Sequence, residues 1–149
     1  MAYAGRFMKL ALEQARFAAL AGEVPVGAVV CHGEDIIAAV HNQRESDKNA
    51  LAHAELLAID TACKVMGGWR LFMCDLYVTL EPCPMCAGAI INSRIRRVVF
   101  GAHDHKSGCF GSITDFSQLP FNHHPEVIGG ICAAESSKLL TDFFSKRRT

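Results

Sequence analysis

The sequence has 149 residues, of which half are apolar and a fifth are charged, and its 15 basic and 15 acidic residues give zero formal net charge. This composition is typical of a globular chain and excludes a disordered one. The length predicts a single domain, residues 1–149, with room for a buried core. Because the net charge is zero, attraction to a nucleic acid would have to come from a local basic patch.

The sequence carries no sign of a membrane segment or of export. No apolar stretch approaches the length that spans a bilayer. Charged Lys9, Glu13 and Arg16 interrupt the apolar N-terminal region before a signal-peptide core could form. The seven cysteines are an odd number, which favours metal ligands and buried thiols over a disulfide framework. We therefore expect a cytoplasmic protein without membrane contact.

Hydrophobic periodicity alternates between helix and strand patterns along the chain. Gly22 follows the first helical pattern, and residues 32–35 form a turn between two β-rich segments, which predicts a hairpin. Asn49 and the pair Gly67-Gly68 are typical of the two ends of a second helix. In chain order, the predicted elements are helix 7–21, strands 24–31 and 36–40, helix 50–66, strand 76–80, helix 84–92, strands 97–100 and 126–131, and helix 132–146.

The middle of the chain predicts how the sheet is connected. The strand over 76–80 leads directly into a helix, and Pro84 suits the first helical turn because its missing N–H is not needed there. The next strand, 97–100, completes a strand–helix–strand unit, which predicts a parallel right-handed crossover. Together with the hairpin, this unit predicts a three-layer α/β/α sandwich around a mixed sheet of about five strands.

A histidine and two cysteines form the most informative pattern in the sequence. His53 is followed thirty positions later by Cys83-Pro-Met-Cys86. Two cysteines three apart on a helix share a face and can grip one ion, and the helix N-terminus there favours thiolate. Three such ligands are typical of a catalytic zinc site, which leaves one position for water. We therefore predict a zinc site formed by His53, Cys83 and Cys86.

Glu55 stands two residues after His53. Positions two apart on a helix do not face each other, which argues against Glu55 as a fourth ligand of the same kind. A carboxylate beside the metal could instead move protons for the water there. The prediction is that Glu55 is the catalytic acid and base.

Three other interpretations of these residues stay open from the pattern alone. Cys83-Pro-Met-Cys86 between a strand and a helix also resembles a thioredoxin-like redox pair, although that leaves His53 unexplained. A closed structural zinc site would need a fourth ligand, for which the candidates are Cys74, His41 and Cys109. In the last interpretation, the histidine belongs to the core and the cysteines are inert.

At these residues the chain resembles the bacterial tRNA-specific adenosine deaminases of the cytidine deaminase-like superfamily. His-x-Glu together with Pro-Cys-x-x-Cys is the signature of zinc-dependent nucleobase deaminases. The further runs that carry the resemblance are residues 23–29, 41–42, 52–55, 77–88, 93–95, 97–102, 106–108, 111–112 and 143–144. The sequence departs from the family at His41, Cys109 and Phe110, which we expect to flank the substrate mouth.

The resemblance implies a homodimer with one Zn²⁺ per subunit that converts adenosine to inosine at the wobble position of a tRNA anticodon. It implies that Asn42 hydrogen-bonds the flipped base and that Asp104 lies near the substrate ribose. From the residue type alone, Asn42 would be a turn or cap residue. Val26 is a second candidate for the wall of the base pocket, although strand periodicity favours an ordinary core residue.

The last predicted helix ends in a basic run. Lys146, Arg147 and Arg148 are candidates for tRNA phosphate contacts, because a base pocket alone cannot hold a tRNA. The alternative explanation is that cations are favourable at a helix C-terminus. Two alternatives to the tRNA substrate remain from the sequence. The first is a deaminase of a free base or nucleoside of the cytosine or guanine type, and the second is a nucleic-acid-binding module with structural zinc.

Overall fold

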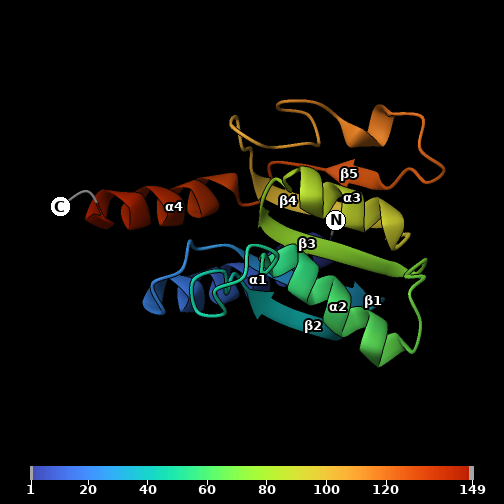
Figure 1. The fold of residues 1–149 in the computed structure, drawn as a ribbon, viewed down its shortest axis with the longest axis horizontal. Coiled ribbons are helices and arrows are strands. Elements are labelled where there is room, and N and C mark those ends of the chain that lie inside the picture. Colours follow the sequence, from blue (N-terminus) through green and yellow to red (C-terminus); the bar gives the residue numbers. More distant parts are fainter. Residues whose placement is uncertain (1, 148–149) are drawn as a thin grey trace.

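The computed structural model describes the backbone of residues 2–147 and the side chains of residues 5–147. Its order of helices and strands is the predicted one (Figure 1). The elements are α1 (Ala2–Leu20), β1 (Gly27–His32), β2 (Asp35–His41), α2 (Ala54–Met66), β3 (Cys74–Leu80), α3 (Pro84–Asn92), β4 (Arg97–Ala102), the 3₁₀ helix η1 (Phe116–Gln118), β5 (Glu126–Ile128) and α4 (Ala133–Arg147).

The strands form one mixed sheet in the order β2-β1-β3-β4-β5. β1 pairs antiparallel with β2 and with β3, whereas β3, β4 and β5 run parallel to one another. The β1–β2 hairpin turns at Gly33, whose φ of 62° is one that glycine adopts without steric cost. α3 connects β3 with its parallel neighbour β4. The structure thus confirms the predicted α/β fold, with its hairpin and its parallel strand–helix–strand unit.

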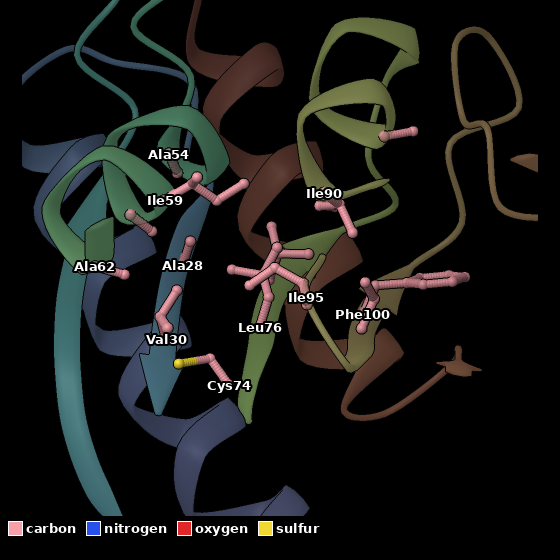
Figure 2. Close-up of a cluster of buried hydrophobic side chains, with 14 of the residues drawn as sticks. Ala28, Val30, Ala54, Ile59, Ala62, Cys74, Leu76, Ile90, Ile95 and Phe100 are labelled. Atoms are coloured by element: carbon pink, nitrogen blue, oxygen red, sulfur yellow. The ribbon is translucent and has the colours of Figure 1, made fainter. Parts of the chain in front are cut away.

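Helices cover both faces of the sheet because the strand side chains alternate between them. On one face, Ala28, Val30 and Leu76 pack with residues of α2 and α3, as Figure 2 shows. On the other face, Val29 and Tyr77 pack against α1, and α4 adds the partly buried Leu139 to the same cluster. Two hydrophobic cores therefore fix the helices against the sheet, and the helix ends then determine which loops meet.

Helix α2 begins four residues later than predicted. Asn49 caps no helix, because its side chain accepts a hydrogen bond from the Leu51 amide within a turn, at 2.9 Å. The N-cap position belongs to His53, whose backbone is extended with φ −72° and ψ 148°. Gly67 ends the helix in the left-handed conformation, as predicted. The shift places His53 at the very start of the helix and not inside it.

Two strand boundaries also differ from the prediction. β1 begins at Gly27 and not at Val24, because Pro25 has no N–H to donate to a neighbouring strand. β5 ends at Ile128, since two glycines follow and Gly130 turns the chain with φ 83°. Among residues 2–147, no helix is both long enough and apolar enough to cross a membrane.

Candidate metal centre and active site

The structure brings three metal-ligating side chains together at the N-termini of two helices. His53 is the N-cap residue of α2, Cys83 is the N-cap residue of α3, and Cys86 lies in the first turn of α3. Their ligand atoms all lie within 4.8 Å of one another. His53 Nδ1 is 3.6 Å from Cys83 Sγ and 3.5 Å from Cys86 Sγ. Two helices that are thirty residues apart therefore meet at this point.

These separations fit a tetrahedral zinc ion. Bonds of about 2.0 Å to nitrogen and about 2.3 Å to sulfur, at the tetrahedral angle, place the two ligand atoms about 3.6 Å apart. One imidazole and two thiolates are also donors that Zn²⁺ binds well. Among the described residues, no further histidine, cysteine, aspartate or glutamate belongs to this group as a fourth ligand. Three protein ligands are typical of catalytic zinc, whereas structural zinc usually has four.

Local sequence explains why the two cysteines point to one place. Pro84 occupies the first helical position of α3, where its missing N–H is tolerated. The Ala87 amide donates to the Cys83 carbonyl oxygen at 2.8 Å, which closes the first turn and brings Cys86 beside Cys83. The positive end of the helix dipole then lies at both sulfur atoms and favours negative charge there.

Electrostatics prepare one of the two cysteines as a thiolate. A hydrogen bond from the Cys86 side chain lowers the pKa of Cys83 to about 4; burial opposes this shift and His53 assists it. The pKa of Cys86 is raised by the same contact and by burial. The hydrogen bond to Cys83 also raises the pKa of His53. A thiolate is the form of cysteine that binds metal. Cys83 therefore suits a cation as it stands, and metal binding would displace the proton of Cys86.

Glu55 lies beside the three ligands but is not one of them. Its residue is only 4% exposed, in the first turn of α2. Burial raises the pKa of this carboxyl to about 7, and a hydrogen bond involving Cys86 opposes the shift. The geometry agrees with the prediction that Glu55 faces the site from outside the ligand set.

A cavity of about 540 Å³ opens over these residues. Its volume is in the range of small-molecule sites. The residues that line it come from six separate stretches of the chain. Those residues are Val24, Val26, Asn42, Arg44, His53, Glu55, Leu80, Glu81, Cys83, His103, Asp104, His105, Lys106, Ser107, Leu140 and Phe144. Both substrate residues implied by the family resemblance, Asn42 and Asp104, are among them.

Asn42 combines the two roles considered from the sequence. Its side-chain oxygen accepts from the Arg44 amide at 3.0 Å, and its amide nitrogen donates to the Val24 carbonyl at 3.4 Å. It is therefore a turn residue that also lines the cavity. Val26 likewise belongs to the hydrophobic core and also lines the cavity, so the two interpretations considered from the sequence do not exclude each other.

The carboxylate of Asp104 closes its own turn. It accepts from the Lys106 amide at 3.0 Å and from the Ser107 amide and hydroxyl at 3.2 and 2.9 Å. This turn lines the same cavity as Asn42. His41, Cys109 and Phe110 do not line the cavity: the last two are buried in the core, and the ring of His41 bonds the Asn42 carbonyl. None of the three is therefore a wall residue, and the expectation that they flank the mouth stays a prediction.

The basic run at the end of α4 is described only in part. The Arg147 guanidinium donates to the Gly22 carbonyl at 2.6 Å and lies 4.7 Å from the centre of the Phe143 ring. Lys146 belongs to the same last turn, and Arg148 lies outside the described residues. One turn earlier, Leu140 and Phe144 line the cavity. The basic end of the helix therefore follows directly on the cavity wall.

Several residues that line the cavity or hold its loops escaped sequence reasoning. Leu140 and Phe144 form an apolar i, i+4 pair, but nothing local shows that they face a cavity. Glu23 and Glu81 are buried carboxylates with 0% and 2% exposure, and their backbone partners lie more than twenty residues away. The only local signal was an acidic residue directly beside an apolar strand segment. All seven cysteines are free, as expected, so no disulfide constrains the site.

Comparison with known proteins identifies relatives along nearly the whole chain. The model of the MafB19-like deaminase family matches residues 4–148. The tRNA-specific adenosine deaminase of Bacillus subtilis (strain 168) is 50% identical over 143 residues, which cover 95% of this chain and 89% of the relative. That of Agrobacterium fabrum (strain C58) is 44% identical over 149 residues, which cover 99% and 98% of the two chains.

Solved structures of deaminases also resemble this chain in fold. A structure from work on A-to-I editing by tRNA:A34 deaminases at the wobble position matches with a TM-score of 0.87 and 45% identity, over 91% of this chain and 99% of that one. The guanine deaminase of Nitrosomonas europaea matches with a TM-score of 0.79 but only 26% identity, over 93% and 83%. The chain therefore belongs to the family of the tRNA-specific adenosine deaminases.

Proposed function

We propose that the protein is a zinc-dependent hydrolase that deaminates adenosine to inosine at the wobble position of a tRNA anticodon. One observation carries this proposal: a histidine and two cysteines form one metal-ligand group, and the buried Glu55 lines the cavity together with His53 and Cys83. Hydrolytic deamination needs this arrangement. The tRNA substrate is supported by identity, since the tRNA-specific relatives reach 50% whereas the guanine deaminase of similar fold reaches 26%.

His53, Cys83 and Cys86 would hold one Zn²⁺ per subunit. When bound, zinc supplies Lewis-acid chemistry that lowers the pKa of a water toward neutrality. Glu55 takes a proton from the attacking water and delivers it to N1 of the adenine ring. The water oxygen bonds to C6; Glu55 then takes the remaining proton from that oxygen and passes it to the exocyclic amine, and the bond between C6 and that nitrogen breaks. Adenosine and water thereby give inosine and ammonia.

The cavity walls would hold the nucleotide for this reaction. Asn42 would bind the edge of the flipped base, and Asp104, in another lining segment, would lie near its ribose. Lys146, Arg147 and Arg148 would contact tRNA phosphates, because the cavity alone is too small to hold a tRNA. An anticodon loop is single-stranded, so turning one base outward costs less than it would in a duplex. The working form would be a cytoplasmic homodimer.

Nucleoside analysis tests the proposal. Zinc-loaded protein is incubated with a tRNA that carries adenosine at the wobble position, and the digested product should contain inosine. Glu55→Ala should retain its zinc yet lose about 10²- to 10⁴-fold in rate, because the proton transfers lose their carrier. Asp60→Asn, at an exposed ion pair farther along α2, is the matched control and should keep the wild-type rate.

Two results would overturn the assignment. Ammonia release from free guanine or cytosine, without inosine in the tRNA, would establish the free-base alternative. No turnover of any of these substrates by protein with a full complement of zinc would point to a nucleic-acid-binding module with structural zinc. Activity of Glu55→Ala at the wild-type rate would remove Glu55 from its role.

A further inference from the structure

Glu81 lies at the junction between the sheet and the metal-binding helix. It directly follows β3 and precedes Cys83 by two residues. Its side chain is completely shielded from solvent. A buried carboxylate destabilises the folded protein unless its oxygen atoms accept hydrogen bonds. The partners that satisfy it are therefore informative about what the residue does.

The partners of Glu81 all come from the loop between β4 and η1. Oε1 accepts from the Asp104 amide at 3.0 Å and from the Ser112 hydroxyl at 2.5 Å. Oε2 accepts from the Phe110 amide at 3.0 Å and from the Ser112 amide at 3.1 Å. One carboxylate thus gathers four donors that span nine residues of the loop.

Backbone hydrogen bonds tie the same two segments together on either side of the carboxylate. The Glu81 amide donates to the Ala102 carbonyl, and the Cys109 amide donates to the Pro82 carbonyl, both at 2.9 Å. Gly108 packs directly on the carboxylate, so closely that a Cβ added there would overlap the Glu81 side chain. The loop is therefore shaped around this one group.

The loop held in this way forms one wall of the cavity. Residues 103–107, which include Asp104, line it, and the Asp104 amide is one of the four donors. Cys83, two residues after Glu81 in the chain, also lines the cavity. Glu81 consequently connects two parts of the cavity lining. It is two residues from Cys83 along the chain, and it accepts a hydrogen bond from the Asp104 amide.

We propose that Glu81 is a positioning residue that holds the cavity wall of residues 103–107 at a fixed distance from the metal-binding cysteines. This inference rests on the proposed function, because it assumes that the wall contacts the nucleotide. Although Glu81 is among the lining residues, both of its carboxylate oxygens accept from loop donors, so in this role it acts through the Asp104 turn. A loosened wall would lower the fraction of molecules ready to bind, and the apparent affinity falls in proportion to that fraction. Once substrate is bound, the wall is held in place again.

The test is Glu81→Gln, which keeps the shape but replaces one accepting oxygen with an amide that meets N–H donors. The expected result is a KM for the wobble-adenosine tRNA raised about tenfold, with kcat within about threefold of wild type, because only the competent fraction changes. The zinc content should be unchanged. In amide hydrogen exchange, the amides of Asp104, Phe110 and Ser112 should exchange faster than in the wild type.

The matched control is Asp75→Asn. Asp75 is also a buried carboxylate, but it lies at the other end of β3, about 20 Å away along the strand, where it pairs with Arg96 and Arg97. Its loss should lower stability while leaving KM and the exchange of the loop amides at wild-type values. Glu81→Gln would then differ from a variant that is only less stable.

A second variant covers the case in which Glu81→Gln yields no folded protein. Ser112→Ala removes the hydroxyl donor alone and should raise KM in the same direction by a smaller factor. Unchanged KM in the folded variants, or loss of zinc from Glu81→Gln, would overturn the inference. If the wild type makes no inosine, the proposed function fails; the exchange experiment still decides whether Glu81 holds the loop.

Discussion

Glu55 and Glu23 are both buried, but the net shifts of their pKa values are opposite. At Glu55, burial dominates and raises the pKa to about 7. At Glu23, burial also acts to raise the pKa, but hydrogen bonds from the Ser46 side chain and from the Glu45 and Ser46 amides outweigh it, and the pKa is lowered. Their lengths are 2.6 to 3.0 Å. Glu23 is therefore kept ionised and ties the loop after Asn42 to the end of α1.

The ionised state of Glu23 predicts a pH dependence of stability. Because its pKa in the folded state is below that in the unfolded state, its contribution is present above the unfolded pKa of about 4.3. It is lost as the pH falls through the lowered folded-state pKa. Glu23→Gln should reduce the free energy of unfolding by about 1–3 kcal/mol at pH 7. Urea unfolding at pH 7 and pH 3 measures both effects.

At pH 3 the difference between Glu23→Gln and the wild type should shrink, since this pH lies below the unfolded-state pKa and the carboxyl of the unfolded chain is then protonated. The control is Glu45→Gln, which removes an exposed carboxyl and keeps the amide that donates to Glu23. A constant difference between Glu23→Gln and the wild type at both pH values would contradict the ionised state of Glu23.

At the scale of the elements, the approach of α1 to β1 depends on one glycine. A Cβ on Gly27 would overlap the Ala11 carbonyl oxygen and lie 2.7 Å from the Ala15 amide nitrogen. The Gly27 amide also donates to the Thr79 hydroxyl at 3.2 Å, which ties β1 to β3. Because the contacts are with helix backbone and not with flexible side chains, neither element can yield without moving as a whole.

Gly27→Ala should therefore destabilise the protein by about 1–3 kcal/mol, the usual cost of forcing additional atoms into a packed interior. The free energy of unfolding in urea measures the change. Gly5→Ala, in the same helix α1, is the control, because no atom within 4 Å meets the added Cβ. Alanine there should leave stability unchanged or raise it by up to about 1 kcal/mol. Equal effects of the two substitutions would contradict the close approach.

At the scale of the whole molecule, the site is assembled from regions far apart in the sequence. The loop after α1, the loop between β2 and α2, the loop after β4, and α4 all contribute to the cavity wall. Figure 1 shows α4 leading away from the sheet toward the C-terminus. Its last described turn carries Lys146 and Arg147, so positive charge continues outward from the cavity in a molecule whose formal net charge is zero.

This arrangement predicts that Lys146, Arg147 and Arg148 contribute to tRNA affinity. Replacing all three by alanine should raise KM for the tRNA and leave kcat near the wild-type value, because phosphate contacts supply affinity and no chemistry. Each lost contact should also reduce the slope of log K against log salt by about 0.7 to 0.9. Binding measured at several salt concentrations gives the slope. An unchanged slope would exclude these residues from the interface.

Lys64→Ala is the control for the loss of positive charge. Lys64 is 76% exposed and pairs with Asp60 in α2, outside the cavity lining. Its replacement should change neither KM nor the salt dependence. An equal effect of this single substitution would indicate general electrostatic attraction and not a contact surface on α4.

The sequence by itself determined the order of the elements and which four residues, His53, Glu55, Cys83 and Cys86, form the candidate site. Helix geometry explains this success, because Cys83, Pro84 and Cys86 lie within one turn, and the same holds for His53 and Glu55. The boundaries that differed, at Asn49 and Pro25, depend on turns in which polar groups compete with helix and strand. Local patterns identify such residues as turn or cap residues but do not fix which bond forms.

Only the tertiary structure decided how the cavity is closed and what holds it. The bonds of Glu81 to the loop at 104–112 and of Glu23 to the loop at 45–46 join segments more than twenty residues apart. The path of the whole chain sets such distances, and no local periodicity carries them. Leu140 and Phe144 reach the cavity for the same reason, since packing of α4 on the sheet determines where its apolar face points.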